Sequence, residues 1–148
     1  MPNASQVAYC GLFCGDCVIR REKIGKRSDD LLRVVDTVEF QKLCVGLPVI
    51  FPGPCKALSK IDECRNVLGA MSELDCERPC RQGGGSARCK IRKCCKKRKI
   101  AGCWECKAFE DCNTLDWLKP VHGDAHRMNL RIIRDKGMTA FLAGKKNW

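Results

Sequence analysis

Ten of the fourteen cysteines in this 148-residue chain fall into three tight clusters. The clusters consist of Cys10, Cys14 and Cys17; of Cys76, Cys80, Cys89 and Cys94; and of Cys103, Cys106 and Cys112. A thiolate is a soft metal ligand, and Cys-x2-Cys and Cys-x3-Cys spacings let two sulfurs reach one ion from a single turn. The sequence therefore predicts a metal-binding protein with these ten residues as ligands.

The ligand type favours zinc in four-thiolate sites, which are structural as a rule because no coordination position stays open for a substrate. Ten thiols suffice for two such sites, so we expect two zinc ions. We also expect a binding or scaffold role rather than catalysis, since no set of base, nucleophile and oxyanion donor is evident. The alternative cofactor is an iron–sulfur cluster, which four cysteines also hold and which would imply electron transfer or redox sensing.

The expected cellular compartment favours metal binding by the cysteines over disulfide formation. The N-terminal stretch MPNASQVAYC lacks the basic and apolar regions of a secretory signal, and no apolar run approaches the roughly 20 residues that span a bilayer. We therefore expect a cytoplasmic protein that does not enter the membrane, with reduced thiols. Either Cys94 or Cys95 can complete the cluster at 103–112, and a spare thiol, Cys10 or Cys95, can carry thiol chemistry instead.

The formal net charge is +11, and residues 88–99 are its densest source. This segment has no acidic residue and eight basic ones: Arg88, Lys90, Arg92, Lys93, Lys96, Lys97, Arg98 and Lys99. Such a run is typical of contact with nucleic acid, and a protein partner also stays open. The same charge can neutralise the metal sites, because a zinc ion with four thiolates carries about −2.

Two histidines, His122 and His126, stand four residues apart with Asp124 between them. On one helix they would share a face and could share an ion. Gly123 indicates that His122 precedes the helix, so we expect packing or capping roles for both imidazoles.

The elements that position these residues are expected to be helices. Apolar residues at helical spacing predict a helix over 29–44, with Ser28 as its N-cap and with Gly46 and Pro48 ending it. A second helix is expected over 55–74. The three cysteines in or beside these helices, Cys44, Cys55 and Cys64, are expected to be small buried hydrophobic side chains.

Further helices are expected from Ser86 to Lys99 and over 125–136, the latter capped by Asp124 and ended by Gly137. Alternation typical of strands is almost absent. The predicted fold is one mainly α domain, 1–148, with little or no β structure. Its helical scaffold is expected at about 28–74 and 113–148, and its irregular cysteine-rich metal lobe at 9–17 and 76–112.

In combination, four segments resemble a family of small bacterial and archaeal cysteine-rich proteins known as domain of unknown function 3795. The segments are YCGLFCGDC (Tyr9–Cys17), CERPCRQGGGSARCKIRKCCKKRKIAGCWEC (Cys76–Cys106), FEDC (Phe109–Cys112) and HGDAHRMNLRIIRDKG (His122–Gly137). The resemblance implies a metal-binding role for the ten clustered cysteines. It implies no established activity and no substrate.

Overall fold

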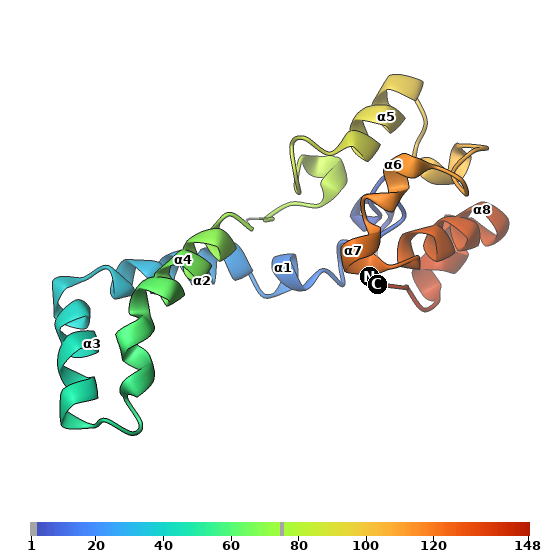
Figure 1. Ribbon diagram of the computed structural model, residues 1–148. Coiled ribbons are helices and arrows are strands. Elements are labelled where there is room, and N and C mark those ends of the chain that lie inside the picture. Colours follow the sequence, from blue (N-terminus) through green and yellow to red (C-terminus); the bar gives the residue numbers. More distant parts are fainter. Residues whose placement is uncertain (1–2, 75) are drawn as a thin grey trace. The chain divides into compact units, whose positions relative to one another are not determined.

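The computed structural model describes residues 3–74 and 76–148, and the chain divides into two compact units. Unit 1 consists of Met1–Arg21 together with Cys76–Trp148, and unit 2 is Glu22–Asp75. The described residues are mainly α-helical and contain no β-strand, which confirms the predicted fold class (Figure 1). That the chain forms a single domain stays a prediction.

Unit 2 is a small set of helices with few buried side chains. Its elements are α2 (Ile24–Val35), α3 (Val38–Ile50), the 3-10 helix η2 (Lys56–Lys60) and α4 (Ile61–Ser72). α4 packs along α2, and α3 packs against η2. The buried hydrophobic side chains of this unit are Val35, Cys44 and Leu68. The buried role expected for Cys44 is confirmed, whereas the same expectation for Cys64 is wrong because this residue is exposed.

The prediction of one helix over 29–44 with a Ser28 cap is wrong. α2 already begins at Ile24, so Ser28 lies inside the helix and is buried. The helix then ends before Thr37, whose hydroxyl donates to the Val34 carbonyl oxygen at 2.8 Å and accepts from the Phe40 N–H at 3.3 Å. These bonds satisfy polar groups at a helix end and a helix start, and therefore favour two helices over one.

The sequence pattern predicted that Gly46 and Pro48 end the helix, and this prediction is wrong. α3 continues to Ile50 with Pro48 inside it. Proline removes one helical hydrogen bond but does not always stop a helix. The helix expected over 55–74 is in fact two elements, η2 and α4.

Unit 1 joins short helices by loops and ends in a longer helix. Its elements are η1 (Ala4–Gln6), α1 (Val18–Arg21), η3 (Cys80–Gln82), α5 (Lys90–Arg98), η4 (Cys103–Glu105), α6 (Asn113–Asp116), α7 (Lys119–His122) and α8 (Ala125–Ala143). One isolated antiparallel bridge pairs Val7 with Phe13. α5 begins later than predicted because Cys89, not Ser86, is its N-cap, with Sγ accepting from the Arg92 N–H at 3.5 Å.

α8 is interrupted where the sequence predicted a helix end. Gly137 has φ 83° and ψ 164° inside the element, so the helical conformation breaks there as expected. Asp124 is the N-cap residue of α8, as predicted, although its side chain makes no capping hydrogen bond. Among the helices of residues 3–74 and 76–148, none combines the length and hydrophobicity needed to cross a bilayer.

The core of unit 1 is built partly from thiols. One cluster of buried side chains consists of Ile91, Cys95, Cys103, Phe109, Leu115 and Leu130, and a second consists of Val7, Phe13, Ile133 and Phe141. α8 supplies residues to both. Gly11, at φ +86°, brings the loop after Cys10 against α8, since an added Cβ would lie 2.9 Å from Leu130 Cδ2. A side chain at this position would be strained by both its conformation and its contact.

Candidate metal centre

Unit 1 contains a cavity of about 180 Å³ whose wall holds six of the ten predicted ligands. We call it the six-thiol pocket; its thiols are Cys10, Cys14, Cys17, Cys76, Cys80 and Cys89. The rest of the wall is formed by Ala8, Leu12, Arg20, Gly84, Gly85, Ser86, Arg92, Trp117 and Trp148. The first cysteine cluster thus meets three members of the second in one mainly apolar cavity with two guanidinium groups.

Arg81 links the two segments that carry these thiols. Its Nε donates to the Val7 carbonyl oxygen at 2.7 Å, and its Nη2 donates to the Ala101 carbonyl oxygen at 2.6 Å. Its guanidinium carbon also lies over the rings of Tyr9, at 4.5 Å, and Trp104, at 5.3 Å. One cation therefore connects the N-terminal segment, the 76–89 loop and the region after α5.

The thiol of Cys10 is hard to ionise without a cation. Burial raises the pKa of Cys10 to about 12, the Leu12 N–H opposes this rise, and the nearby thiols of Cys80, Cys89 and Cys14 add to it. Each added negative charge in a low-dielectric site disfavours the next thiolate. A bound metal ion reverses this effect.

The thiol of Cys14 has a similar environment on another side of the pocket. Burial raises the pKa of Cys14, the Cys80 N–H opposes this, and the thiols of Cys80, Cys76 and Cys17 raise it further. Cys14 and Cys80 are therefore neighbours through both backbone and side chain. All six thiols of the pocket lie within electrostatic reach of Cys10 or Cys14.

Two arginines supply positive charge to this pocket. Arg92 is buried and donates to the carbonyl oxygens of Cys80 (3.1 Å), Gly84 (2.7 Å) and Ser86 (2.7 Å), which fixes the loop between two of the thiols. Arg20 Nε is buried and has no hydrogen-bond partner among the described residues. Arg20 as a whole is half-buried, so its guanidinium group supplies positive charge at the wall of the pocket.

A second set of thiols lies around the end of α5. We call it the four-thiol group; it consists of Cys95, Cys103, Cys106 and Cys112. The Sγ atoms of Cys95 and Cys103 are 3.5 Å apart and buried, and Cys106 and Cys112 pack against the same hydrophobic cluster. The hydrogen bond between the first two lowers the pKa of Cys95 and raises that of Cys103. Cys106 Sγ accepts from Arg98 Nη1 at 2.8 Å.

The two adjacent cysteines of α5 have opposite environments. Cys95 is 1% exposed, whereas Cys94, one of the predicted ligands, is exposed and belongs to neither thiol group. Ile91 and Cys95 stand four residues apart and share the buried face of the helix. This spacing was the signal that could have placed Cys95, rather than Cys94, beside the 103–112 cluster.

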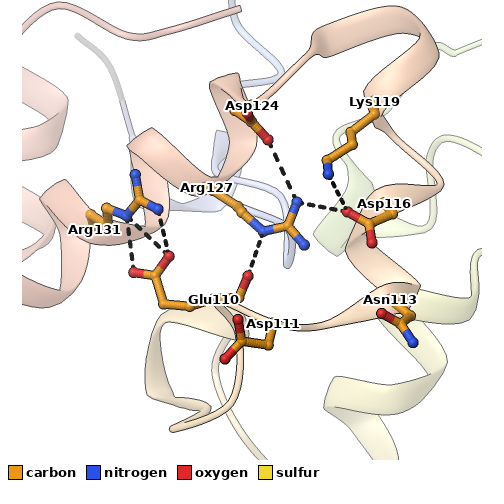
Figure 2. A pocket seen from close by; sticks show the side chains of 8 residues that line it. All are labelled: Glu110, Asp111, Asn113, Asp116, Lys119, Asp124, Arg127 and Arg131. Atoms are coloured by element: carbon orange, nitrogen blue, oxygen red, sulfur yellow. Dashed lines mark hydrogen bonds and ion pairs between the residues drawn. The ribbon is translucent and has the colours of Figure 1, made fainter.

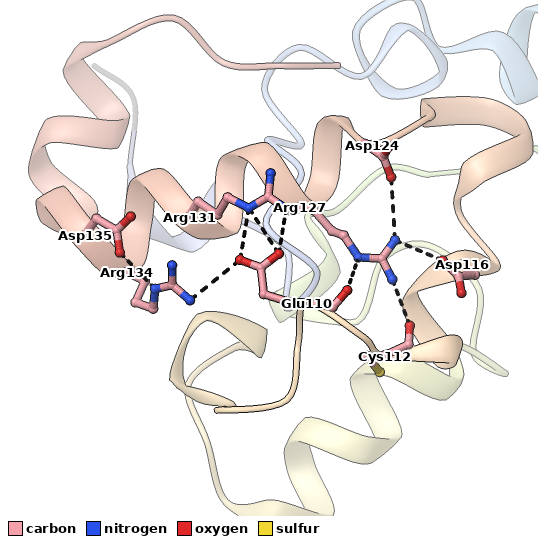
Figure 3. Close-up of polar contacts among 8 residues, drawn as sticks. All are labelled: Glu110, Cys112, Asp116, Asp124, Arg127, Arg131, Arg134 and Asp135. Atoms are coloured by element: carbon pink, nitrogen blue, oxygen red, sulfur yellow. Dashed lines mark hydrogen bonds and ion pairs between the residues drawn. The ribbon is translucent and has the colours of Figure 1, made fainter.

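The turn that carries Cys112 is held from α8 by a buried arginine. Arg127 Nε donates to the Glu110 carbonyl oxygen at 3.0 Å, Nη2 to the Cys112 carbonyl oxygen at 3.1 Å, and Nη1 to Asp116 Oδ1 at 2.9 Å (Figure 3). Arg131 adds a bidentate pair to the Glu110 carboxylate and lowers the pKa of that group. The backbone on both sides of Cys112 is thus fixed.

These charged groups line a second cavity, of about 410 Å³ (Figure 2). Most of its acidic and basic side chains pair with one another: Asp116 also contacts Lys119 at 2.9 Å, and Asp124 lies 3.6 Å from Arg127. We therefore interpret this cavity as the outer side of the polar network that holds the Cys112 turn, and not as a ligand site.

The two histidines influence each other electrostatically, but their rings make different contacts. His126 is fully buried and neither ring nitrogen has a hydrogen-bond partner among the described residues, while the His122 ring stacks edge-on against Trp148 at 4.9 Å. Burial lowers the pKa of both. The contact with Trp148 agrees with the packing role expected for His122.

The basic segment divides into one buried and seven exposed residues. Arg92 is buried in the loop contacts described above, so it is not available to a partner. The exposed side chains are Arg88, Lys90, Lys93, Lys96, Lys97, Arg98 and Lys99. None of these seven forms an ion pair with an acidic residue in the described parts of the chain.

In residues 3–74 and 76–148, no three cysteine, histidine or acidic side chains have the geometry to hold a metal ion. The thiols are gathered but do not form a ready ligand set.

A protein-family model described as "Protein of unknown function (DUF3795)" matches residues 6–117. The chain belongs to this family. The matched region of this DUF3795 protein contains both thiol groups, while α8 lies beyond it. No curated protein and no solved structure matches the chain. Family membership therefore agrees with the resemblance read from the sequence and brings no activity with it.

Proposed function

We propose that unit 1 of this DUF3795 protein binds zinc through both thiol groups, and that the protein serves as a metal-dependent binding or scaffold protein rather than an enzyme. The observation that carries the proposal is the gathering of ten thiols from distant parts of the sequence into the six-thiol pocket and the four-thiol group. A reducing compartment such as the cytoplasm would keep them available.

The sulfur separation in the four-thiol group supports a shared ion. Zinc–sulfur bonds of about 2.3 Å in a tetrahedron place two sulfurs about 3.8 Å apart. The Sγ atoms of Cys95 and Cys103 are 3.5 Å apart, a few tenths of an ångström from that value. A disulfide would need about 2.05 Å. These two residues are therefore positioned as neighbouring ligands.

The free energy of zinc binding is large enough to reorient thiols that do not yet point at one centre. The remaining side chains must rotate toward the ion, at a cost of order 1 kcal/mol for a strained rotamer. Structural zinc sites contribute about 10–16 kcal/mol at neutral pH, which exceeds this cost. Zinc would also offset the raised pKa of Cys10 and Cys14. The Arg20 and Arg92 guanidinium groups complement the negative charge of a thiolate site.

Four-thiolate coordination favours a structural role. A closed site leaves no position for a substrate or an activated water molecule. The Cys95 and Cys103 side chains are part of the hydrophobic core of unit 1, so an ion there would tie α5 to the loop after it. Such an ion would stabilise a fold whose core is small.

The test is metal analysis of anaerobically purified protein, followed by chelation. We expect zinc, no iron, a colourless solution, and loss of helical circular dichroism on chelation that added zinc restores. Iron with acid-labile sulfide and a brown colour would favour the iron–sulfur alternative and a role in electron transfer or redox sensing. Protein that holds neither metal and stays folded would refute metal binding.

Nucleic-acid binding is a second candidate function, favoured by the exposed cations of residues 88–99. Unit 1 carries 20 basic and 8 acidic residues, whereas unit 2 carries 8 and 9, so the positive charge is concentrated in unit 1. Lys90, Lys93 and Lys97 follow one another at the spacing of a single helix face, away from buried Ile91 and Cys95. Such a stripe complements a phosphate backbone.

Binding of a fluorescent duplex oligonucleotide at several salt concentrations tests this function. We expect affinity to fall steeply with salt, and the triple variant Lys90→Gln/Lys93→Gln/Lys97→Gln to reduce the slope of log K against log salt by up to about 2.7. A control with Lys42→Gln and Lys56→Gln in unit 2 should leave the slope unchanged. Equal binding by the wild type, the triple variant and the control would exclude α5 as the nucleic-acid interface. The exposed cations of residues 88–99 would then be interpreted as a surface for a protein partner.

A further inference from the structure

Cys95 and Cys103 have the geometry of an oxidisable pair as well as that of neighbouring zinc ligands. Their Sγ atoms are 3.5 Å apart, and the two residues are 1% and 8% exposed. A disulfide bond is about 2.05 Å long, so the two sulfurs need to approach each other by about 1.5 Å, a movement shared between two side chains. The contact therefore places two thiols where removal of two electrons would join them.

The backbone holds these two residues close to each other without help from a metal ion. Lys99, with φ 56° and ψ 36°, ends α5 in the left-handed conformation, and the Ile100 N–H donates to the Cys95 carbonyl oxygen at 3.1 Å. The chain therefore reverses direction directly after the helix. The Cys103 N–H donates to the Tyr9 carbonyl oxygen at 2.8 Å, which anchors the other end of this turn.

The surroundings of the pair are strongly basic. The four residues that follow Cys95, from Lys96 to Lys99, are all basic and all exposed. One of them, Arg98, donates from Nη1 to Cys106 Sγ at 2.8 Å, so its positive charge lies at the four-thiol group. Positive charge near thiols favours the thiolate, which is the form that peroxides oxidise.

The contact selects a different pair from the one that sequence spacing would suggest. Cys103 and Cys106 have the Cys-x2-Cys spacing typical of redox dithiols. Cys106 Sγ accepts a hydrogen bond from Arg98, however, whereas Cys103 Sγ lies against Cys95 Sγ. The neighbouring thiol of Cys94 is exposed and belongs to neither thiol group.

We propose that Cys95 and Cys103 are an oxidation site at which a hydroperoxide forms a disulfide, and that this disulfide releases zinc from the four-thiol group. The inference rests on the proposed zinc-binding function and adds its regulation. Two of the four ligands are lost, and the two remaining thiolates are too few for a closed structural zinc site. The disulfide still joins α5 to the loop after it, so this link in unit 1 is kept when the ion leaves.

The reaction balances with hydrogen peroxide as the oxidant. The sulfurs of Cys95 and Cys103 lose two electrons and form the S–S bond, while the O–O bond of the peroxide breaks as the peroxide accepts them. Two protons from solvent complete two water molecules, and two more protonate Cys106 and Cys112 as these leave the ion. Zn²⁺ is released, and a thiol reductant reverses the oxidation by disulfide exchange.

Controlled oxidation of the zinc-loaded full chain tests the proposal. Hydrogen peroxide is added stepwise under anaerobic conditions, and zinc release is followed with a chromogenic chelator. The remaining thiols are then alkylated, and the chain is digested with trypsin for mass spectrometry. The basic residues between Cys95 and Cys103 place the two cysteines in different tryptic peptides, so their disulfide joins two peptides, and fragmentation assigns the sulfurs.

We expect the Cys95–Cys103 disulfide to form first, with one zinc ion released for each disulfide and rebound after reduction. A first disulfide between Cys103 and Cys106, or within the six-thiol pocket, would overturn the proposal. Zinc that stays bound in peroxide without any disulfide would also overturn it but leave the proposed function intact. A chain that binds no zinc removes the proposed function, and the same disulfide in that chain still supports the oxidation site.

The exposed thiol next to this pair provides a matched control. Cys94→Ser should form the same disulfide and release the same amount of zinc, because Cys94 contacts neither partner sulfur in the described structure. Loss of zinc release in this variant would assign the reaction to the exposed thiol and contradict the proposal. Disulfide mapping in the unaltered chain does not depend on the folding of any variant.

Discussion

Adjacent cysteines in α5 allow a matched test of which thiols the fold uses. Cys95 is 1% exposed with its Sγ atom 3.5 Å from that of Cys103, whereas Cys94 is exposed. Cys95→Ser removes a proposed zinc ligand and leaves a hydroxyl in an apolar cluster. Even without metal, a buried polar group with a lost partner costs about 1–3 kcal/mol. Cys94→Ser should cost less than about 0.5 kcal/mol, as for most surface substitutions.

Thermal unfolding and zinc analysis measure both effects. For a chain of this size 1 kcal/mol shifts Tm by about 2–4 °C, so Cys95→Ser should lower Tm by at least about 2 °C, and by about 12 °C at 3 kcal/mol. The loss is larger where zinc contributes to stability, and the variant should contain one zinc ion fewer. Cys94→Ser should keep both the wild-type Tm and zinc content. Equal losses in both variants, or a loss in Cys94→Ser alone, would refute the assignment of Cys95 to the four-thiol group.

Three further substitutions test the framework of unit 1. Gly11→Ala should destabilise the protein by more than about 1 kcal/mol in urea unfolding, because this position combines a φ of +86° with a close contact to Leu130. The control Gly46→Ala should not destabilise it in this way, because no atom lies within 4 Å of the added Cβ. Arg127→Lys cannot reproduce three hydrogen bonds to the 110–116 segment, so it should speed zinc transfer to a chromogenic chelator. Burial lowers the pKa of His126, so its contribution to the free energy of unfolding is fully present above the pKa of about 6.5 in the unfolded chain and is lost as the pH falls below that value. His126→Asn should therefore reduce the pH dependence of stability between pH 7.5 and 5.5, measured by urea unfolding. An unchanged pH dependence would contradict this role of His126.

The sequence indicated which thiols gather in unit 1 better than how they are arranged. Cysteine spacing identified nine of these ten thiols, because residues close in sequence stay close in space. It could not indicate that Cys10 and Cys80 share a cavity. That arrangement depends on contacts between distant segments, such as the Arg81 guanidinium with the Val7 carbonyl oxygen and the Tyr9 ring. Such contacts have no local pattern.

Helix boundaries show a similar limit. The mainly α fold and the break at Gly137 followed from apolar spacing and from the conformational freedom of glycine. Ser28 was a plausible cap by residue type, but Thr37 is the residue whose hydroxyl makes the capping bond. Several side chains compete to cap nearby positions, and the packing of α4 along α2 selects among them.

Sulfur coordination of zinc by the gathered thiols is most directly measured by X-ray absorption at the zinc edge of the purified, metal-loaded chain. We predict a first shell made only of sulfur at about 2.3 Å, with four sulfurs per zinc. A first shell of nitrogen and oxygen at about 2.0–2.2 Å would contradict thiolate coordination, because it would place the metal on histidine, carboxylate or water instead.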